Sequence, residues 1–274
     1  MSQACNDNCK TCSKACGERR EPQSLLAEPN SKSHVKKVIG VVSGKGGVGK
    51  SLTTSLLASA FAKQGKQVGI LDADITGPSI PRMFGIHEKA MGSPDGLIPA
   101  QAADGTKIMS TNLLLDNETD PVIWRGPVIA GVVKQFWSDV VWGDIDYLFV
   151  DMPPGTGDVP LTVFQSLPVD SIVVVTSPQE LVGMIVAKAV NMAQTLNIPV
   201  AGLIENMAYF VCPNCDEKHF IFGETKIESL AHEFGISATA QIPMDPRIAE
   251  LCDEGRVDQV ASPWLTAIIN TLAS

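Results

Sequence analysis

The 274-residue sequence lacks the features that would draw a protein to a polyanion or into a membrane. It has 21 Lys and Arg residues against 30 Asp and Glu, a net charge of −9 and a pI of about 4.9. This balance disfavours sequence-independent binding to nucleic acid and to anionic membranes. No apolar run approaches the roughly 20 residues of a transmembrane helix, and the N-terminus lacks the apolar segment of a signal peptide. We therefore expect a cytoplasmic protein that binds neither nucleic acid nor membrane.

What the sequence does contain is a hydrophobic fraction of 45%, enough for a large core, and seven cysteines. In the reducing cytoplasm, cysteines favour metal or redox chemistry over a disulfide framework. Residues 1–34 are polar and hold four of these cysteines, so we interpret them as an N-terminal segment and linker outside the core fold. Residues 35–274 are expected to form one domain.

Apolar stretches alternate with helical ones along this domain. "VKKVIGVVSGKGG" is an apolar run ending in glycines, and a helix is predicted from Lys50 to about Lys63. Further strands are predicted in "QVGILDAD", "YLFVDMPPGTGD", "DSIVVVTSP" and "PVAGLIEN", with a helix in "LVGMIVAKAVNMAQTL". The pattern predicts an α/β fold with a doubly wound, mostly parallel sheet and ligands at the C-terminal ends of its strands. Residues 85–120 are rich in Gly, Pro, Asp and Asn and are expected to be irregular.

The segment "GKGGVGKS" matches the phosphate-binding pattern G-x-x-x-x-G-K-[ST] between an expected strand and an expected helix. Glycines let backbone N–H groups approach phosphate oxygens, and the helix N-terminus adds a favourable field. The ammonium of Lys50 would neutralise phosphate charge, and the hydroxyl of Ser51 would ligate Mg²⁺. The predicted nucleotide-binding residues are Gly44, Gly46, Gly47, Val48, Gly49, Lys50, Ser51 and Leu52.

Carboxylates follow two of the expected strands. Asp72 and Asp74 in "LDAD" are expected to point to opposite sides of the strand end, so that only one faces the γ-phosphate directly. Asp151 in "FVDMPPGTGD" has the position of a carboxylate that holds Mg²⁺ or its water. Residues 153–155 after it would form a loop that senses the γ-phosphate. The alternative role for each aspartate is to cap a helix or turn.

A C-x-x-C pair, Cys212 and Cys215, lies in "YFVCPNCDEKHF". Half of a zinc site is one interpretation, but His219 as a third ligand would still leave one ligand missing. A thioredoxin-like redox pair would need a βαβ context that is not present before it. The residues between and after the cysteines mark an exposed turn, which argues against two packed core thiols. The remaining interpretation is half of a site that a second chain completes, because a [4Fe–4S] cluster takes four thiolates and a twofold axis would supply them.

The N-terminal cysteines Cys5, Cys9, Cys12 and Cys16 are spaced C-x3-C-x2-C-x3-C. Four thiols this close together suit an iron–sulfur cluster or zinc, and a flexible thiol-rich tail is the third alternative. Cys252 lies alone on an expected helix, which favours a packed core residue over a ligand.

The order and spacing of the motifs resemble one family. "GKGGVGKS", "DADITGPSIP", "WRGP" (124–127), "DMPPGTGD", "ENM" and "CPNC" occur as in the Mrp-type (ApbC-like) iron–sulfur cluster carriers of the MinD/ParA deviant Walker A superfamily. The similarity covers about residue 36 to the end. It implies a P-loop NTPase fold like that of MinD and the nitrogenase iron protein, and slow ATP hydrolysis. It also implies a homodimer in which Cys212 and Cys215 of each subunit bridge a labile [4Fe–4S] cluster that passes to iron–sulfur apoproteins, with assembly factors as further partners.

The resemblance also implies roles for residues of the nucleotide site. Lys45 resembles the signature lysine that reaches across a dimer to the partner's nucleotide. Together with Lys50 and Asp74 it forms the implied catalytic set, in which Asp74 orients the attacking water. Asp72 is implied to support the magnesium shell of Ser51 and Asp151.

Three further residues, Asn206, Pro243 and Asp245, look like the family's adenine contacts. Some scaffold members of the family carry an N-terminal four-cysteine cluster site, but with longer gaps than those found here. The resemblance therefore leaves a second iron–sulfur cluster or zinc as alternatives for the N-terminal segment.

Two functions of other classes remain as alternatives. A MinD-type positioning ATPase attaches to membranes through a basic amphipathic C-terminal helix, whereas "VASPWLTAIINTLAS" contains no Lys or Arg. The periodic residues Trp264, Leu265, Ile268 and Leu272 instead predict a helix docked on the core. A reductase like the nitrogenase iron protein would hold its cluster with cysteines that lie far apart in the sequence.

Overall fold

The structure is a computed structural model that describes residues 25–75, 77, 79–115, 126–155, 157–178 and 182–274. The four N-terminal cysteines, Cys5, Cys9, Cys12 and Cys16, lie outside these residues, as do Trp124 and Arg125 of the "WRGP" segment.

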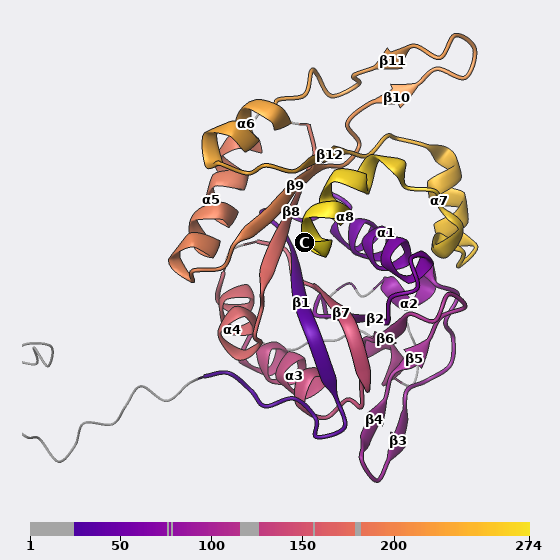
Figure 1. Cartoon of the computed structure of the whole chain (residues 1–274). Coiled ribbons are helices and arrows are strands. Elements are labelled where there is room, and N and C mark those ends of the chain that lie inside the picture. Colours follow the sequence, from indigo (N-terminus) through magenta and orange to yellow (C-terminus); the bar gives the residue numbers. More distant parts are fainter. Residues whose placement is uncertain (1–24, 76, 78, 116–125, 156, 179–181) are drawn as a thin grey trace, which may run out of the picture.

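A mostly parallel sheet forms the centre of the domain (Figure 1). Within the described residues it has eight strands in the order β12-β9-β8-β1-β7-β2-β6-β5, and only β5 pairs antiparallel to its neighbour. The predicted α/β fold class is confirmed. The strands are β1 (His34–Ser43), β2 (Val68–Asp72), β5 (Ala100–Gln101), β6 (Lys107–Met109), β7 (Asp144–Asp151), β8 (Ser171–Thr176), β9 (Val200–Glu205) and β12 (Thr239–Gln241).

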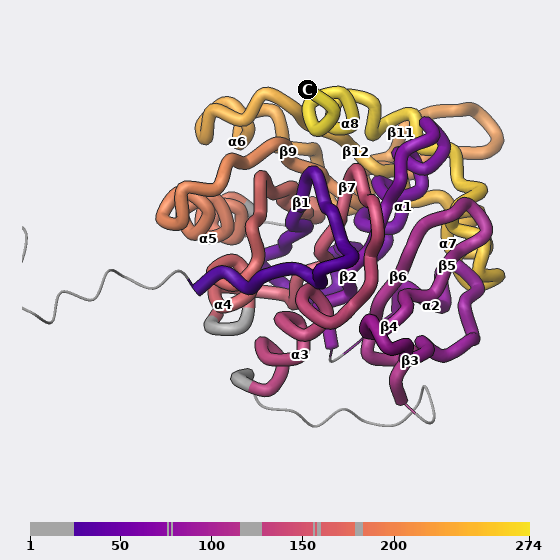
Figure 2. The backbone as a smooth tube through the Cα atoms, turned by 60° about the horizontal axis from the view of Figure 1, so that its bottom comes forward, coloured from indigo at the N-terminus to yellow at the C-terminus, as the bar shows by residue number. Residues whose placement is uncertain are grey.

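Helices cover both faces of this sheet (Figure 2). One face carries α3 (Gly126–Ser138), α4 (Asp158–Ser166), α5 (Val182–Thr195) and α6 (Ile227–Phe234). The other carries α1 (Lys50–Lys63), α2 (Ile80–Met83), α7 (Pro246–Asp253) and α8 (Thr266–Ala273). Short 3-10 helices span Thr111–Leu113, Val257–Gln259 and Pro263–Leu265.

Because both faces of the sheet are covered by helices, the strands are continuous apolar runs in the sequence. Along β1, Val38 and Val42 pack into the core under α3–α6, whereas Ile39 and Val41 pack into the core under α1 and α8. Successive side chains of a strand point to opposite faces, so a strand buried on both faces needs apolar residues at every position.

The expectation of an irregular segment over residues 85–120 is wrong. This segment contains a small hairpin, β3 (Met91–Ser93) with β4 (Gly96–Ile98), and the strands β5 and β6 of the main sheet. β6 is only three residues long and pairs parallel to β2, with Ile108 opposite Ile70. Three residues carry too little alternation to predict a strand, and β6 exists because β2 offers it a free edge.

The C-terminal helix α8 docks on the core as predicted. Leu265, Ile268 and Leu272 are buried, and Trp264 packs against the same cluster. In the part of the chain that the structure describes, none of the helices combines the length and apolarity that spanning a membrane requires.

Part of the expected linker also lies against the domain. The Ala27 N–H donates to the Ser166 carbonyl (2.8 Å), and the indole N–H of Trp137 donates to the Ala27 carbonyl (2.8 Å). The Asn30 side chain is buried and donates to the Asp95 carbonyl (2.9 Å). These contacts place residues 27–33 on the α3–α4 side of the sheet.

The chain connections change direction at the C-terminal ends of β1 and β7. The connection from β1 to β2 runs through α1 on one face, and the connection from β7 to β8 runs through α4 on the other. Neighbouring strands whose connections leave on opposite faces create the usual ligand crevice of open parallel sheets. In the register, Asp151 at the end of β7 lies opposite Val41 of β1 and Asp72 of β2.

Candidate functional site

The loop from Gly44 to Gly49 joins β1 to α1 at this crevice. Gly49 is the N-cap of α1 with φ of 83°, a left-handed conformation that favours glycine. A Cβ at this position would collide with the amide of Asn206, which donates from Nδ2 to the Val48 carbonyl (3.0 Å). No side chain caps the N-terminus of α1, so its first N–H groups are available to an anion.

Lys50, the first residue of α1, is buried beneath this loop. Its side chain is 5% exposed, and Nζ lies 2.9 Å from Asp151 Oδ2 and 3.5 Å from Asp74 Oδ2. Among the described residues, Nζ has no acceptor in hydrogen-bonding alignment. A buried ammonium with donors to spare is costly unless an acceptor arrives, and phosphate oxygens of a nucleotide fit that need.

Two hydroxyl groups of α1 hold the carboxylate of Asp151. Ser51 donates to Oδ2 (2.6 Å) and Thr54 donates to Oδ1 (2.8 Å), while Asp151 itself is fully buried. The two hydroxyls converge because residues three apart share one face of a helix. This set of oxygen atoms suits Mg²⁺. Thr54 was not predicted, and its spacing of three from Ser51 is the signal that could have identified it.

Asp72 and Asp74 both face Lys50, so the expectation that they point to opposite sides is wrong. The Asp74 N–H donates to Asp72 Oδ1 (3.2 Å), and both carboxylates interact electrostatically with Lys50. Alternation over two residues returns the side chain to the same face of a strand.

Asp72 is also the more deeply buried of the two carboxylates. Burial raises its pKa well above the ordinary value, and the charge of Asp151 raises it further, against the opposing effects of Lys50 and Ser110. The Ser110 hydroxyl, which donates to Asp72 Oδ2 (2.9 Å), was not predicted, because it follows the unpredicted strand β6.

Lys45 and residues 153–155 were also predicted to act at the nucleotide, and both contact Ser43 at the start of the phosphate loop. Lys45 is partly buried in the loop, and its carbonyl accepts a hydrogen bond from the Ser43 hydroxyl (3.0 Å). The segment 153–155 lies against the start of the loop, since the Gly155 N–H donates to the Ser43 carbonyl (2.9 Å). This hydrogen bond links the two segments, so a movement of one would displace the other.

The segments predicted to contact adenine run side by side. The Ala208 N–H donates to the Ile242 carbonyl (3.0 Å) and the Met244 N–H donates to the Tyr209 carbonyl (2.7 Å). These bonds bring Asn206 and Pro243 into neighbouring segments.

Asp245 caps α7 by accepting the Arg247 N–H (2.9 Å), and the guanidinium of Arg247 lowers the pKa of Asp245. Pro243 and Asp245 line a cavity of about 790 Å³ that Phe210 and Val211 also line. The structure thus gives Asp245 the role of a helix cap. The contacts of Asn206, Pro243 and Asp245 with adenine remain predictions.

The C-x-x-C pair sits at the tip of a hairpin formed by β10 (Phe210–Val211) and β11 (Lys218–His219), which projects from the body (Figure 1). Cys212 is partly buried and Cys215 is exposed. The Cys212 N–H donates to the Glu217 carbonyl (2.9 Å) and closes the turn. Hydrogen bonds from the Asn214 and Cys215 N–H groups, followed by the Cys215 side chain, lower the pKa of the Cys212 thiol. The turn is therefore exposed, as expected, and favours the thiolate that binds metals.

The segment that follows β11 is apolar and exposed. Phe220, Ile221 and Phe222 follow β11 and are 40%, 61% and 47% exposed. Cys252, by contrast, lies on α7 and packs against the core, where burial raises the pKa of its thiol. The prediction that Cys252 is a packing residue is confirmed.

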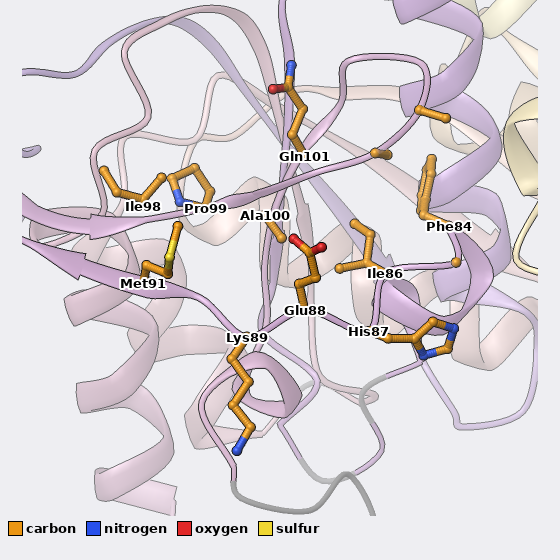
Figure 3. Close-up of a pocket in the computed structure, with 13 residues that line it drawn as sticks. Phe84, Ile86, His87, Glu88, Lys89, Met91, Ile98, Pro99, Ala100 and Gln101 are labelled. Atoms are coloured by element: carbon orange, nitrogen blue, oxygen red, sulfur yellow. The ribbon is translucent and has the colours of Figure 1, made fainter.

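A separate cavity of about 500 Å³ lies between the end of α2 and strands β3 to β5 (Figure 3). Its lining combines apolar side chains such as Phe84, Ile86 and Met91 with the polar His87 and Glu88. Of the predicted site residues that the structure describes, none lines this cavity.

Comparisons with known proteins identify relatives along nearly the whole domain. The family described as ParA, "NUBPL iron-transfer P-loop NTPase", matches residues 34–273. The "Iron-sulfur cluster carrier protein" of Methanocaldococcus jannaschii is 45% identical over 260 residues, covering 92% of this chain and 89% of that protein. The "Cytosolic Fe-S cluster assembly factor CFD1" of Eremothecium gossypii is 40% identical over 240 residues, covering 84% and 85%.

Solved structures agree with this relationship. A nucleotide-binding protein of Archaeoglobus fulgidus, in complex with ADP and with cobalt found by PIXE, is 46% identical with a TM-score of 0.77, covering 85% of this chain and 91% of that one. The septum site-determining protein MinD of Pyrococcus horikoshii, complexed with Mg-ADP, is 19% identical with a TM-score of 0.58, covering 87% and 94%, and supports the fold alone. The chain belongs to the ParA family of NUBPL-type iron-transfer P-loop NTPases.

Proposed function

We propose that this protein is an ATP-dependent iron–sulfur cluster carrier. Two copies of the chain hold a [4Fe–4S] cluster between them and pass it to apoproteins. The observation that carries the proposal is the pair Cys212 and Cys215, partly buried and exposed respectively, at the tip of a hairpin that extends from a P-loop body. The pair supplies two of the four thiolates such a cluster takes, and a twofold axis doubles it. Relatives named as cluster carriers and as a cytosolic assembly factor support this cargo.

The nucleotide site supports slow ATP hydrolysis. Lys50 is positioned to neutralise charge on the β- and γ-phosphates, and Ser51 with Asp151 is positioned to hold Mg²⁺. A bound Mg²⁺ would supply charge stabilisation to the phosphates. Asp74 lies 3.5 Å from the Lys50 ammonium, which supports its role in orienting the attacking water. Lys45 would add a positive charge to the nucleotide of the partner subunit.

Coupling between nucleotide and cluster would follow a short stretch of chain. The Asn206 side chain donates to the phosphate-loop carbonyl of Val48, and β10 begins only a few residues later. A nucleotide that shifts the phosphate loop would therefore pull on the base of the hairpin that carries Cys212. The segment 153–155, hydrogen-bonded to Ser43, would transmit the state of the γ-phosphate.

The N-terminal cysteines, Cys5, Cys9, Cys12 and Cys16, are proposed to bind a second iron–sulfur cluster. Their four thiolates match the number that such a cluster takes. Zinc is the alternative occupant, and metal analysis of the purified protein distinguishes the two.

The test is anaerobic reconstitution with iron and sulfide of the full chain in which the four N-terminal cysteines are replaced by serine. We expect about four iron atoms per two chains and a dimer by size-exclusion chromatography. The additional replacement Cys212→Ser/Cys215→Ser should abolish iron binding, whereas Cys252→Ser, which removes a thiol packed against the core, should leave it unchanged. ATP-dependent transfer to an apoprotein completes the test. A parent that takes up no iron would refute the proposal and favour a positioning ATPase.

A further inference from the structure

The hairpin carries a third metal-ligating side chain beside its two thiols. We propose that His219 completes a three-ligand site with Cys212 and Cys215, so that one chain alone binds a single divalent transition-metal ion. This mononuclear site lies within one chain and differs from the cluster that two chains would share. The inference goes beyond the proposed function and does not depend on it.

The strand register places His219 next to the thiols. β10 and β11 pair antiparallel, with Phe210 opposite His219, and alternation puts Cys212 on the same face as both. Diagonal neighbours across a strand pair are within reach of long side chains.

The distances between the ligating atoms fit one ion. The thiol sulfurs of Cys212 and Cys215 and an imidazole nitrogen of His219 all lie within 4.8 Å of one another. Tetrahedral zinc with its usual bond lengths sets ligand atoms about 3.5–3.8 Å apart, so small side-chain movements would close the site.

Aromatic contacts on the opposite face fix the backbone around His219. The Lys218 ammonium lies 4.3 Å from the centroid of the Tyr209 ring, and the Phe220 ring lies 6.4 Å from it in an edge-on arrangement. Tyr209 is itself buried against the body. Both sequence neighbours of His219 are therefore anchored to one buried ring, which lowers the entropy cost of gathering the three ligands.

The chemistry of the ligands selects the metal. Two thiolates and one imidazole suit Zn²⁺, Co²⁺ and Fe²⁺ and disfavour Mg²⁺ and Ca²⁺. Cys215 and His219 are exposed, so a fourth position faces solvent and accepts water or a thiolate from another molecule. An ion bound here would occupy the same thiols that a bridging cluster needs.

The test is an anaerobic titration of the metal-free full chain with Co²⁺, again with serine at the four N-terminal cysteine positions and with Mg-ADP present to fill the phosphate loop. We expect one cobalt per chain, with thiolate-to-cobalt charge-transfer bands and the strong visible bands of tetrahedral cobalt. His219→Ala should weaken cobalt binding by at least about tenfold and shift the visible bands, because it removes a direct ligand. His232→Ala, at an exposed histidine of α6, should behave as the parent does.

Three results would overturn the inference: no cobalt binding by the parent, one cobalt per two chains with an all-thiolate spectrum, or a His219→Ala variant with the parent's affinity and spectrum. Circular dichroism and ADP binding confirm that each variant is folded. Iron–sulfur reconstitution is measured separately in the same variants, so failure of the mononuclear site and failure of the cluster proposal are distinguishable.

Discussion

Thr54→Val removes one hydroxyl from the helix that faces Asp151 and keeps nearly the same side-chain shape. The lost hydroxyl lies 2.8 Å from Asp151 Oδ1, and the carboxylate is fully buried, so water cannot replace the missing donor. Lys50 and Ser51 would remain as the partners of Asp151. The Thr54 hydroxyl also lies 3.0 Å from the Lys50 carbonyl, four residues earlier in the helix, so the bond to Asp151 is isolated only by comparison with a control that has the same contact.

The neighbouring residue supplies a matched control. Thr53 is equally buried, but its hydroxyl donates to the Gly49 carbonyl (3.0 Å), which already accepts the first hydrogen bond of the helix. A hydrogen bond to a charged group contributes about 1.5–3 kcal/mol, whereas a neutral one contributes about 0.5–1.5 kcal/mol. We expect Thr54→Val to lower the free energy of unfolding by about 1 kcal/mol more than Thr53→Val does.

Urea denaturation of the nucleotide-free protein measures this difference, with an unchanged slope confirming that both variants unfold similarly. In thermal melts, about 1 kcal/mol corresponds to about 2–4 °C for a chain of this size. Calorimetry should also show weaker Mg-ADP binding for Thr54→Val alone. Equal destabilisation by the two substitutions, or none by either, would refute the view that α1 holds Asp151 by this bond.

Three further predictions concern the same crevice. Gly49→Ala should abolish ADP binding in calorimetry, because φ is 83° and the new Cβ would collide with Asn206, whereas Gly131→Ala, which meets nothing within 4 Å on α3, should bind normally. Asn206→Ala leaves the Val48 carbonyl without its side-chain donor and should weaken ADP binding by about five- to thirtyfold, or about 1–2 kcal/mol; an unchanged affinity would contradict this. Burial raises the pKa of Asp72 above 3.8, so the folded protein keeps a proton that the unfolded chain releases. The stability that this proton contributes is fully present below pH 3.8 and declines as the pH rises towards the pKa of the folded state. Asp72→Asn should therefore gain stability relative to the parent as the pH rises above about 3.8 in urea titrations, and a constant difference would count against the raised pKa.

The sequence alone was sufficient for the features that depend on local pattern. Apolar runs separated by helical periodicity predicted a sheet covered on both faces, because a doubly buried strand needs apolar residues at every position. The glycines and Lys50 of the phosphate loop predicted an anion site, because they follow an apolar strand and open a helix whose first N–H groups are unpaired. The polar residues and the proline around Cys212 and Cys215 predicted an exposed turn.

What only the tertiary structure decided are contacts between segments far apart in the chain. Ser110 reaches Asp72 because the three-residue strand β6 pairs with β2, and so short a strand has no periodic signal of its own. Thr54 meets Asp151 because α1 packs over the end of β7, ninety-seven positions away in the chain. Asp72 and Asp74 lie on the same side because they are two residues apart near the end of a strand. Both interact with Lys50 because the fold brings α1 to that strand end. Strand register and packing depend on pairing between distant segments. A local sequence pattern therefore cannot specify which distant hydroxyl will donate a hydrogen bond to a buried carboxylate.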